Sequence, residues 1–173
     1  MKKILSLILI VTTVFSFVGC SKKTELNVKV KDILDDIKGE IAKDMKDKGV
    51  KEESLKDGKL PGFMDIDLTK EKNPFSEIFS KEDIKEGYIL QQMMNVKSDL
   101  IIVLKAKDES KVKDLKTSLE KIKKGQVNTW EKYLPDQYKK VQNNIIKTKG
   151  KYLVYITYDN PEKIEKIFNN SLK

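Results

Sequence analysis

Apolar residues recur along the chain with two different periods, and these periods predict its helices and strands. Spacings of three to four residues are typical of an amphipathic helix, whereas strict alternation is typical of a half-buried strand. Helical spacing covers residues 30–49, 108–134 and 161–168, and Pro135 can begin a further short helix. Strand-like patterns cover residues 64–68, 88–94, 100–104, 145–149 and 152–158.

The strand-like segments are expected to pair as two antiparallel hairpins. One joins 88–94 to 100–104, and the other turns at Gly150. Segment 100–104 is continuously apolar and β-branched, which is typical of a central strand covered on both faces. The order of elements predicts an α+β fold: a two-layer sandwich in which an antiparallel sheet of about four to five strands has its helices packed on one face.

Two pairs of residues inside these segments lead to predictions about local structure. Gly125 and Gln126 interrupt the apolar stripe of the helix at 108–134, and they predict a kink or break there. Met93 and Met94 end the first strand of a hairpin. Such a pair could line a soft binding groove, but we expect it to fill gaps in the core, which is the commoner use of methionine.

The first twenty residues have the pattern of an export signal. Lys2 and Lys3 precede the uncharged segment 4–18, which is short of the ~20 residues that a membrane-spanning helix needs. Gly19 then precedes Cys20, the one cysteine of the chain. The pattern predicts a signal peptide over 1–19, a tether over 20–29 and a single domain over 30–173. There are two alternatives for this N-terminal segment. It could be an ordinary cleaved signal peptide followed by an incidental cysteine, or an anchor that is not cleaved.

The stretch around Cys20 resembles the lipobox of bacterial lipoproteins, although Phe17 stands where that group usually has leucine. The resemblance implies that diacylglycerol is linked to the sulfur of Cys20 and that the leader is cut between Gly19 and Cys20. Two acyl chains hold a protein stably on a membrane, whereas one binds only marginally. The domain would then lie on the outer face of the cell membrane, within the ~30 Å that an extended tether can reach.

The charge of the chain argues against nucleic acid as a partner. The formal net charge is +8, and every basic residue is lysine. A nucleic-acid-binding protein is expected to use arginine for bidentate contacts to phosphate and guanine. The lysine excess is typical of an AT-rich genome, so most of these side chains are expected to be solvated surface. A looser contact with anionic lipid or with an anionic wall polymer stays open.

The residue types present leave little room for catalysis. The chain contains no histidine, and Cys20 is assigned to the lipid, so the usual zinc ligands and the usual base of a serine or cysteine nucleophile are missing. An EF-hand loop beginning at Asp65 would need glycine and glutamate where the chain has Lys70 and Ser76. We therefore predict no enzyme, no metal and no cofactor, with carboxylate chemistry at Asp65 and Asp67 as the least favoured alternative.

Three segments resemble the domain-of-unknown-function 4358 family: residues 100–108 (LIIVLKAKD), 130–138 (WEKYLPDQY) and 146–152 (IKTKGKY). The similarity covers roughly residues 84–168. Members of this family are largely lipoproteins of Gram-positive bacteria. The resemblance implies a membrane-anchored extracytoplasmic domain without an assigned activity, and it brings no catalytic residues.

These observations favour a non-enzymatic lipoprotein that binds another component of the cell envelope, either a protein or a polymer. Trp130, Tyr133 and Tyr138 form the expected contact surface, because tryptophan and tyrosine are favoured at binding hot spots. The alternative for these rings is that they cap the core at a helix end. The alternative function is a receptor for a small ligand or peptide, associated with a transporter or a sensor, which would need a concave apolar pocket.

Overall fold

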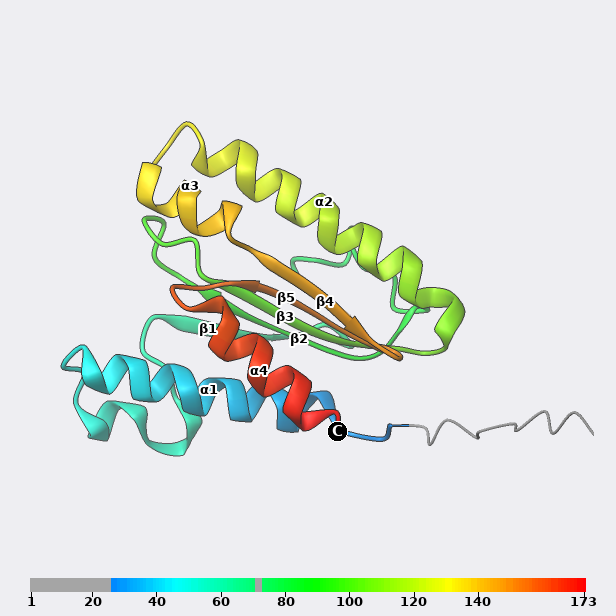
Figure 1. Cartoon of the computed structure of the whole chain (residues 1–173), viewed down its shortest axis with the longest axis horizontal. Coiled ribbons are helices and arrows are strands. Elements are labelled where there is room, and N and C mark those ends of the chain that lie inside the picture. Colours follow the sequence, from blue (N-terminus) through cyan, green and yellow to red (C-terminus); the bar gives the residue numbers. More distant parts are fainter. Residues whose placement is uncertain (1–25, 71–72) are drawn as a thin grey trace, which may run out of the picture.

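The computed structural model describes residues 26–70 and 73–173, so the predicted signal peptide, Gly19 and Cys20 lie outside the described residues. The helices are α1 (Val30–Asp47), α2 (Val112–Trp130), α3 (Pro135–Gln142) and α4 (Pro161–Ser171), with short 3-10 helices η1 (Glu52–Gly58) and η2 (Glu109–Lys111). The strands are β1 (Phe63–Asp67), β2 (Ile84–Gln92), β3 (Leu100–Ala106), β4 (Ile145–Lys149) and β5 (Tyr152–Thr157). Figure 1 shows their arrangement.

The five strands form one antiparallel sheet in the order β1-β2-β3-β5-β4. Both predicted hairpins are present, as β2–β3 and β4–β5, and β3 joins them by pairing with β5. The predicted α+β class and the antiparallel sheet are therefore confirmed. Strand β3 is central and every one of its residues is buried, because neighbouring strands and helices enclose it on all sides.

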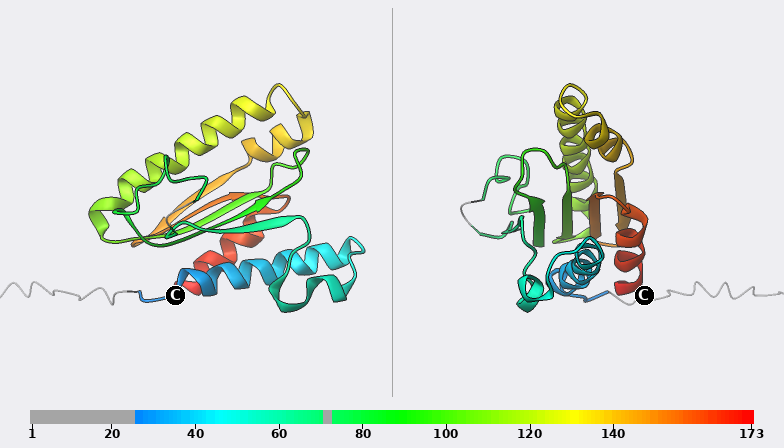
Figure 2. Two further views of the ribbon diagram at one scale, coloured as in Figure 1. Left: turned by 180° about the vertical axis from the view of Figure 1, so that it is seen from behind. Right: turned by 90° about the vertical axis from the view of Figure 1, so that its left-hand side faces the viewer.

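The sheet has helices on both faces, rather than on the single face that the sequence predicted (Figure 2). Ile101 and Val103 of β3 pack into a core shared with α1 and α4. Ile102 and Leu104, which point to the opposite face, pack into a second core with α2. The apolar character of both residue sets on β3 requires this third layer, since a face open to water would leave one set exposed.

Helix α2 runs without interruption from Val112 to Trp130, so the predicted break at Gly125 and Gln126 is wrong. Leu119 and Ile122 are buried against the sheet before the glycine, and Trp130 is buried after it. Packing on both sides of Gly125 therefore outweighs the ~1 kcal/mol by which glycine weakens a helix interior. A Cβ added at Gly125 would meet nothing within 4 Å in the described structure.

The segment that precedes α1 is bound to the sheet by Tyr152. The Tyr152 hydroxyl accepts a hydrogen bond from Val28 N at 2.9 Å and lies 2.7 Å from the Val28 carbonyl and 3.1 Å from that of Leu26. Next to it, the buried Lys105 ammonium bonds Asn27 Oδ1 at 3.1 Å and lies 5.0 Å from the Tyr152 ring centre. The chain is thus held to the domain from Leu26 onward.

Figure 1 shows where this attachment lies in the molecule. Leu26 and the C-terminus are at one end, whereas the β2–β3 loop and the connection between α2 and α3 are at the opposite end. Glu86 reinforces the attachment, because its Oε2 accepts a hydrogen bond from Val30 N at 2.8 Å at the start of α1. A carboxylate there also matches the positive end of the helix dipole.

Candidate functional site

Large apolar side chains are exposed at six positions in the described part of the chain, and they do not scatter evenly. They are Met64, Ile78, Met93, Met94, Val96 and Tyr133. Four of the six lie in the β2–β3 loop or just after α2, at the end opposite Leu26 (Figure 1). Exposed apolar clusters on a small domain are typical of interaction sites.

The expected core role of the methionine pair is wrong. Met93 and Met94 are 62% and 54% exposed. Strand β2 ends at Gln92, and the backbone N–H of Met93 donates to the Gly62 carbonyl at 2.7 Å, which extends the pairing with β1 by one residue, whereas both methionines lie beyond the paired part of β3. Both side chains consequently leave the core with the loop.

Two partly open cavities lie along the side of α2 that faces the β2–β3 loop and the segment around Phe75. The first has a volume of about 330 Å³ and is lined by Phe75, Ile78, Ile122, Gly125 and Gln126, among others. The second has a volume of about 200 Å³, and its lining includes Gln91, Met93, Met94, Gln126 and Trp130. Since both contain Gln126, we treat them as one feature and call it the α2 groove.

The lining of the α2 groove mixes apolar and polar side chains, and several of the polar groups have a defined orientation. Gln126 Oε1 accepts a hydrogen bond from Trp130 Nε1 at 2.8 Å. Ser98 N donates to Gln137 Oε1 at 2.9 Å, which joins the β2–β3 loop to α3. Oriented polar groups beside exposed apolar side chains can fix the position of an organic ligand or a peptide.

The three predicted contact residues, Trp130, Tyr133 and Tyr138, do not share one environment. Trp130 is 6% exposed and belongs to the groove wall, whereas Tyr133 is 52% exposed beside it, with ring centres 5.7 Å apart. Tyr138 is half-buried on α3. Sequence reasoning missed Gln91 and Gln126, whose amide side chains carry no periodic signal. It noticed Met93 and Met94 but assigned them to the core.

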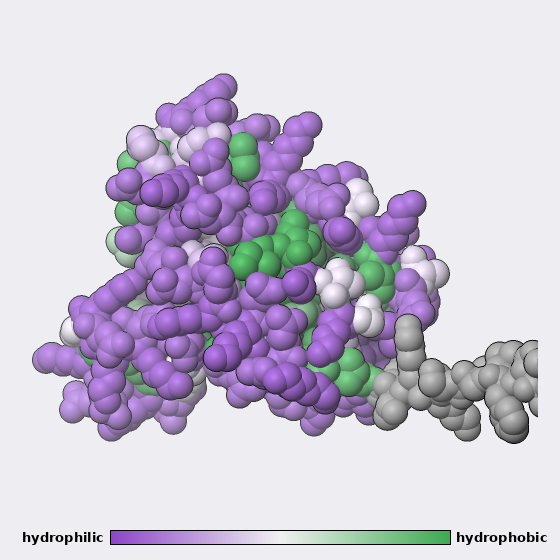
Figure 3. Space-filling view, in the orientation of Figure 1, coloured by the Kyte–Doolittle hydropathy of each residue, from purple (hydrophilic) through white to green (hydrophobic). Residues whose placement is uncertain are grey.

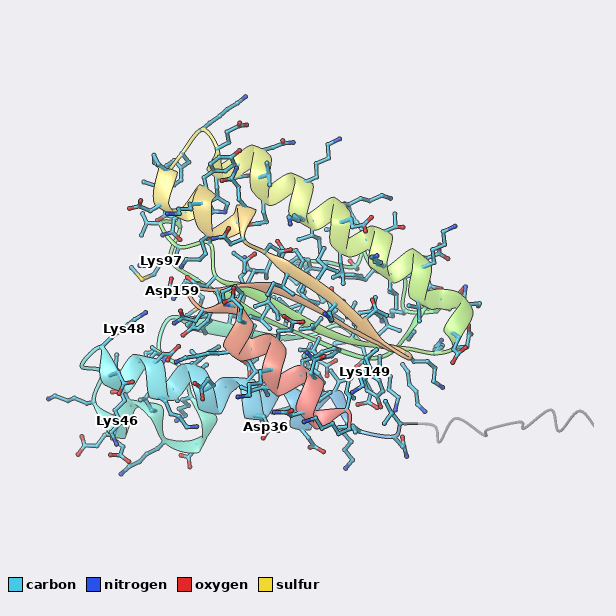
Figure 4. All side chains as sticks on the ribbon, in the orientation of Figure 1. Asp36, Lys46, Lys48, Lys97, Lys149 and Asp159 are labelled. Atoms are coloured by element: carbon cyan, nitrogen blue, oxygen red, sulfur yellow. The ribbon has the colours of Figure 1, made fainter. Side chains whose placement is uncertain are left out.

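Ion pairs fix the base of the β2–β3 loop to three other elements. Lys140 Nζ on α3 lies 2.9 Å from Asp99 Oδ1 and 2.7 Å from Asp159 Oδ1, and Lys48 Nζ lies 2.6 Å from Asp159 Oδ2. Burial alone would raise the pKa of Asp159, but hydrogen bonds from Lys140 and Lys48 outweigh it and hold that pKa at about 2. Figure 4 labels Lys48, Asp159 and the loop residue Lys97 at this end of the molecule.

The carboxylates considered for calcium or catalysis have other partners in the structure. Asp65 Oδ2 lies 2.6 Å from Lys38 Nζ on α1, and Asp67 Oδ1 accepts hydrogen bonds from Thr69. Within residues 26–70 and 73–173, no group of three or more acidic, cysteine or histidine residues is arranged to hold a metal ion. Nor does any helix in these ranges combine the length and hydropathy needed to cross a bilayer.

The face of the molecule that carries β4 differs from the groove side. Figure 3 shows this face as mostly hydrophilic, with hydrophobic residues gathered over β4 between the α2 and α4 layers. Ile145 and Ile146 of β4 are half-buried and pack against the two cores. This patch is the outer edge of the cores, not a separate site.

Comparison with known proteins identifies the family of the chain. No curated protein and no solved structure matches it. A family model described as a domain of unknown function matches residues 70–158, more than half of the chain and somewhat N-terminal to the predicted 84–168. This range contains β2 to β5, α2 and α3, and with them most of the α2 groove. The chain belongs to the domain-of-unknown-function 4358 family.

Proposed function

We propose that this protein is a lipid-anchored, extracytoplasmic binding protein of the cell envelope, without enzymatic activity, which holds a segment of an exported or membrane protein in the α2 groove. The observation that carries the proposal is the concentration of exposed large apolar side chains around that groove: Met93 and Met94 line it, as does Ile78, and the Tyr133 ring lies beside Trp130 of its wall, with the two ring planes tilted by 46°.

The chemistry of the groove favours a protein segment over an enclosed small molecule. Both cavities are partly open, so an occupant can enter and leave along the C-terminal half of α2. Methionine side chains adapt to different apolar partners, and tryptophan and tyrosine supply rigid contact area. A small ligand, the alternative occupant, would leave much of its surface in contact with water in so open a site.

The charged residues of the α2 groove indicate which kind of protein segment it would bind. Lys97 and Lys121 line the groove, and the carboxylate of Asp99 is already paired with Lys140. Glu77 is the remaining acidic residue among the lining positions. An apolar segment flanked by aspartate or glutamate therefore fits better than a basic segment.

The attachment at Leu26 gives the proposed anchor a geometric consequence. Five residues separate Cys20 from Leu26, and an extended chain over this interval reaches only ~20 Å. The end of the domain that carries Leu26 would then lie next to the bilayer. The β2–β3 loop, at the other end, would be directed away from the membrane, where exported proteins can reach it (Figure 1).

Gly125 provides the test of the groove, because a side chain there would enter the cavity without disturbing the fold. A photo-crosslinking residue is placed at Met94, and the full chain is irradiated in intact cells. Gly125→Leu should abolish most of the crosslinking while raising the free energy of unfolding by about 0.5–1 kcal/mol, since leucine is the better helix former.

Gly125→Ala is the matched control, because it brings the same helix stabilisation and almost no bulk. It should keep crosslinking near the wild-type level. A photo-crosslinker at the exposed Lys166 of α4 should capture no Gly125-sensitive product. The proposal fails if Gly125→Leu captures as much at Met94 as wild type, or if the captured peptide carries a basic rather than an acidic flank.

The anchor has its own test in Cys20→Ser. The substitution removes the thiol that diacylglycerol would modify, so labelling with a radioactive fatty acid should disappear and processing at Gly19 should stop or slow. Wild-type protein should carry the label and fractionate with membranes. Complete membrane association of Cys20→Ser with an unprocessed leader, together with an unlabelled wild type, would disprove lipidation.

A further inference from the structure

The two helical layers of the domain carry opposite charge. Helix α1 contains four lysines and six acidic residues, and α4 contains two of each. Helix α2 contains five lysines and two acidic residues, and α3 contains two lysines and one aspartate. The helices of the α1 and α4 layer therefore have a net charge of −2, and those of the α2 and α3 layer have a net charge of +4. A general bias toward lysine would not separate the charges in this way.

The lysines of α1 are neutralised locally. Each of the four has a carboxylate within 4.0 Å: Lys31 with Asp35, Lys38 with Asp65, Lys43 with Glu40 and Lys46 with Glu52. These cations already have partners on the protein, so this layer offers little attraction to an external anion.

The lysines of α2 are different. Lys116 has a distant pair with Glu120 at 3.9 Å, and Lys123 Nζ bonds the Asn144 carbonyl at 3.3 Å. Lys113, Lys121 and Lys124 are exposed and have no carboxylate within 4.0 Å among the described residues. Figure 4 shows long side chains projecting from α2 into solvent.

We propose that the outward face of α2 and α3, with Lys113, Lys124 and Lys139, binds a linear phosphate-rich polymer of the cell envelope. From Lys113 to Lys124 the helix rises about 16 Å, and Lys139 is exposed on α3, which packs against α2. A polymer contacts several of these cations at once and gains avidity, whereas a single phosphate ion does not.

The position of the tether favours a polymer over the lipid headgroups of the anchoring membrane. This step uses the extracytoplasmic anchor proposed above. Leu26 and Val28 pack against the core of the α1 and α4 layer, on the other face of the sheet from α2. Three layers of helix, sheet and helix are roughly 30 Å thick, which exceeds the ~20 Å that the segment from Cys20 to Leu26 can span. Helix α2 therefore cannot lie flat on that bilayer.

The test measures binding of inorganic polyphosphate at 0.15 M salt to the protein extracted from membranes in mild detergent. The triple variant Lys113→Gln, Lys124→Gln, Lys139→Gln should bind at least tenfold more weakly and show a shallower salt dependence. The matched control is Lys31→Gln, Lys43→Gln, Lys46→Gln on α1, which changes the net charge equally and should stay within twofold of wild type. Glutamine and lysine have similar helix propensity, so both variants should fold.

Three results would overturn the proposal. The first is a wild-type protein that does not bind polyphosphate. The second is an equal loss of affinity in the two triple variants, which would indicate net charge alone. The third is binding of phosphatidylglycerol vesicles through the α2 lysines without binding of polyphosphate. Orthophosphate alone should compete only at much higher phosphate concentration. None of the three lysines lines the α2 groove, so crosslinking at Met94 succeeds or fails independently of this experiment.

Discussion

Replacing Lys140 with methionine should lower the free energy of unfolding by about 3 kcal/mol, because it leaves the buried carboxylate of Asp99 without its cation. Lys140 is 10% exposed and its Nζ bridges Asp99, which is 7% exposed, and Asp159, which is 42% exposed. Asp99 loses its ion pair entirely, whereas Asp159 keeps Lys48. Urea unfolding followed by circular dichroism measures the change.

The neighbouring Lys139 supplies the control for this prediction. Lys139 is exposed, and no ion pair joins it to a carboxylate among the described residues. Lys139→Met should change the free energy of unfolding by less than about 0.5 kcal/mol. If Lys139→Met and Lys140→Met destabilise equally, the bridge between Asp99 and Asp159 does not hold the loop as described.

The same bridge predicts how acid affects stability. The pKa of Asp159 is about 2 in the folded protein, below the ~3.9 of an unfolded aspartate. Its contribution to stability is therefore present above pH ~4 and is lost as the pH falls toward 2, because the unfolded chain binds the proton first. In Lys140→Met the pKa of Asp159 rises toward its ordinary value, and this part of the acid destabilisation should shrink.

Replacing either Ile101 or Ile102 with alanine should lower the free energy of unfolding by about 3 kcal/mol, although the two side chains point to opposite faces of the sheet. Both residues are fully buried, Ile101 in the core with α1 and α4 and Ile102 in the core with α2. A sheet covered on one face would show one large and one small effect. If helices cover both faces, the two variants should lower the urea midpoint of unfolding equally, and the dependence of the free energy on urea concentration should not change.

Ile145→Ala is the comparison for these two variants. Ile145 is half-buried on the edge strand β4, where less surface leaves water on folding, so its replacement should cost only about 1 kcal/mol. A cost at Ile102 as small as that at Ile145 would show that α2 is not packed on the sheet as described.

The sequence by itself determined the elements and much of their pairing. Helical spacing located α1 and α4, alternation located β1, and Gly150 marked the turn between β4 and β5. These features follow from contacts between residues close in sequence, which local periodicity and turn residues record directly. The continuous apolar run of β3 also indicated burial on both faces, although the predicted two-layer arrangement did not use it.

Only the tertiary structure decided which surfaces these elements leave open. Met93 and Met94 are exposed because they lie in the β2–β3 loop, beyond the pairing of β2 with β3, and the continuity of α2 at Gly125 depends on packing against the sheet. Lys140 meets Asp99 from 41 residues away, and Tyr152 holds Leu26 from 126 residues away. Contacts over such separations leave no period in the sequence, because they are set by how the layers stack. The α2 groove is lined by residues from the segment around Phe75, from the β2–β3 loop and from α2, so it appears only in the folded chain.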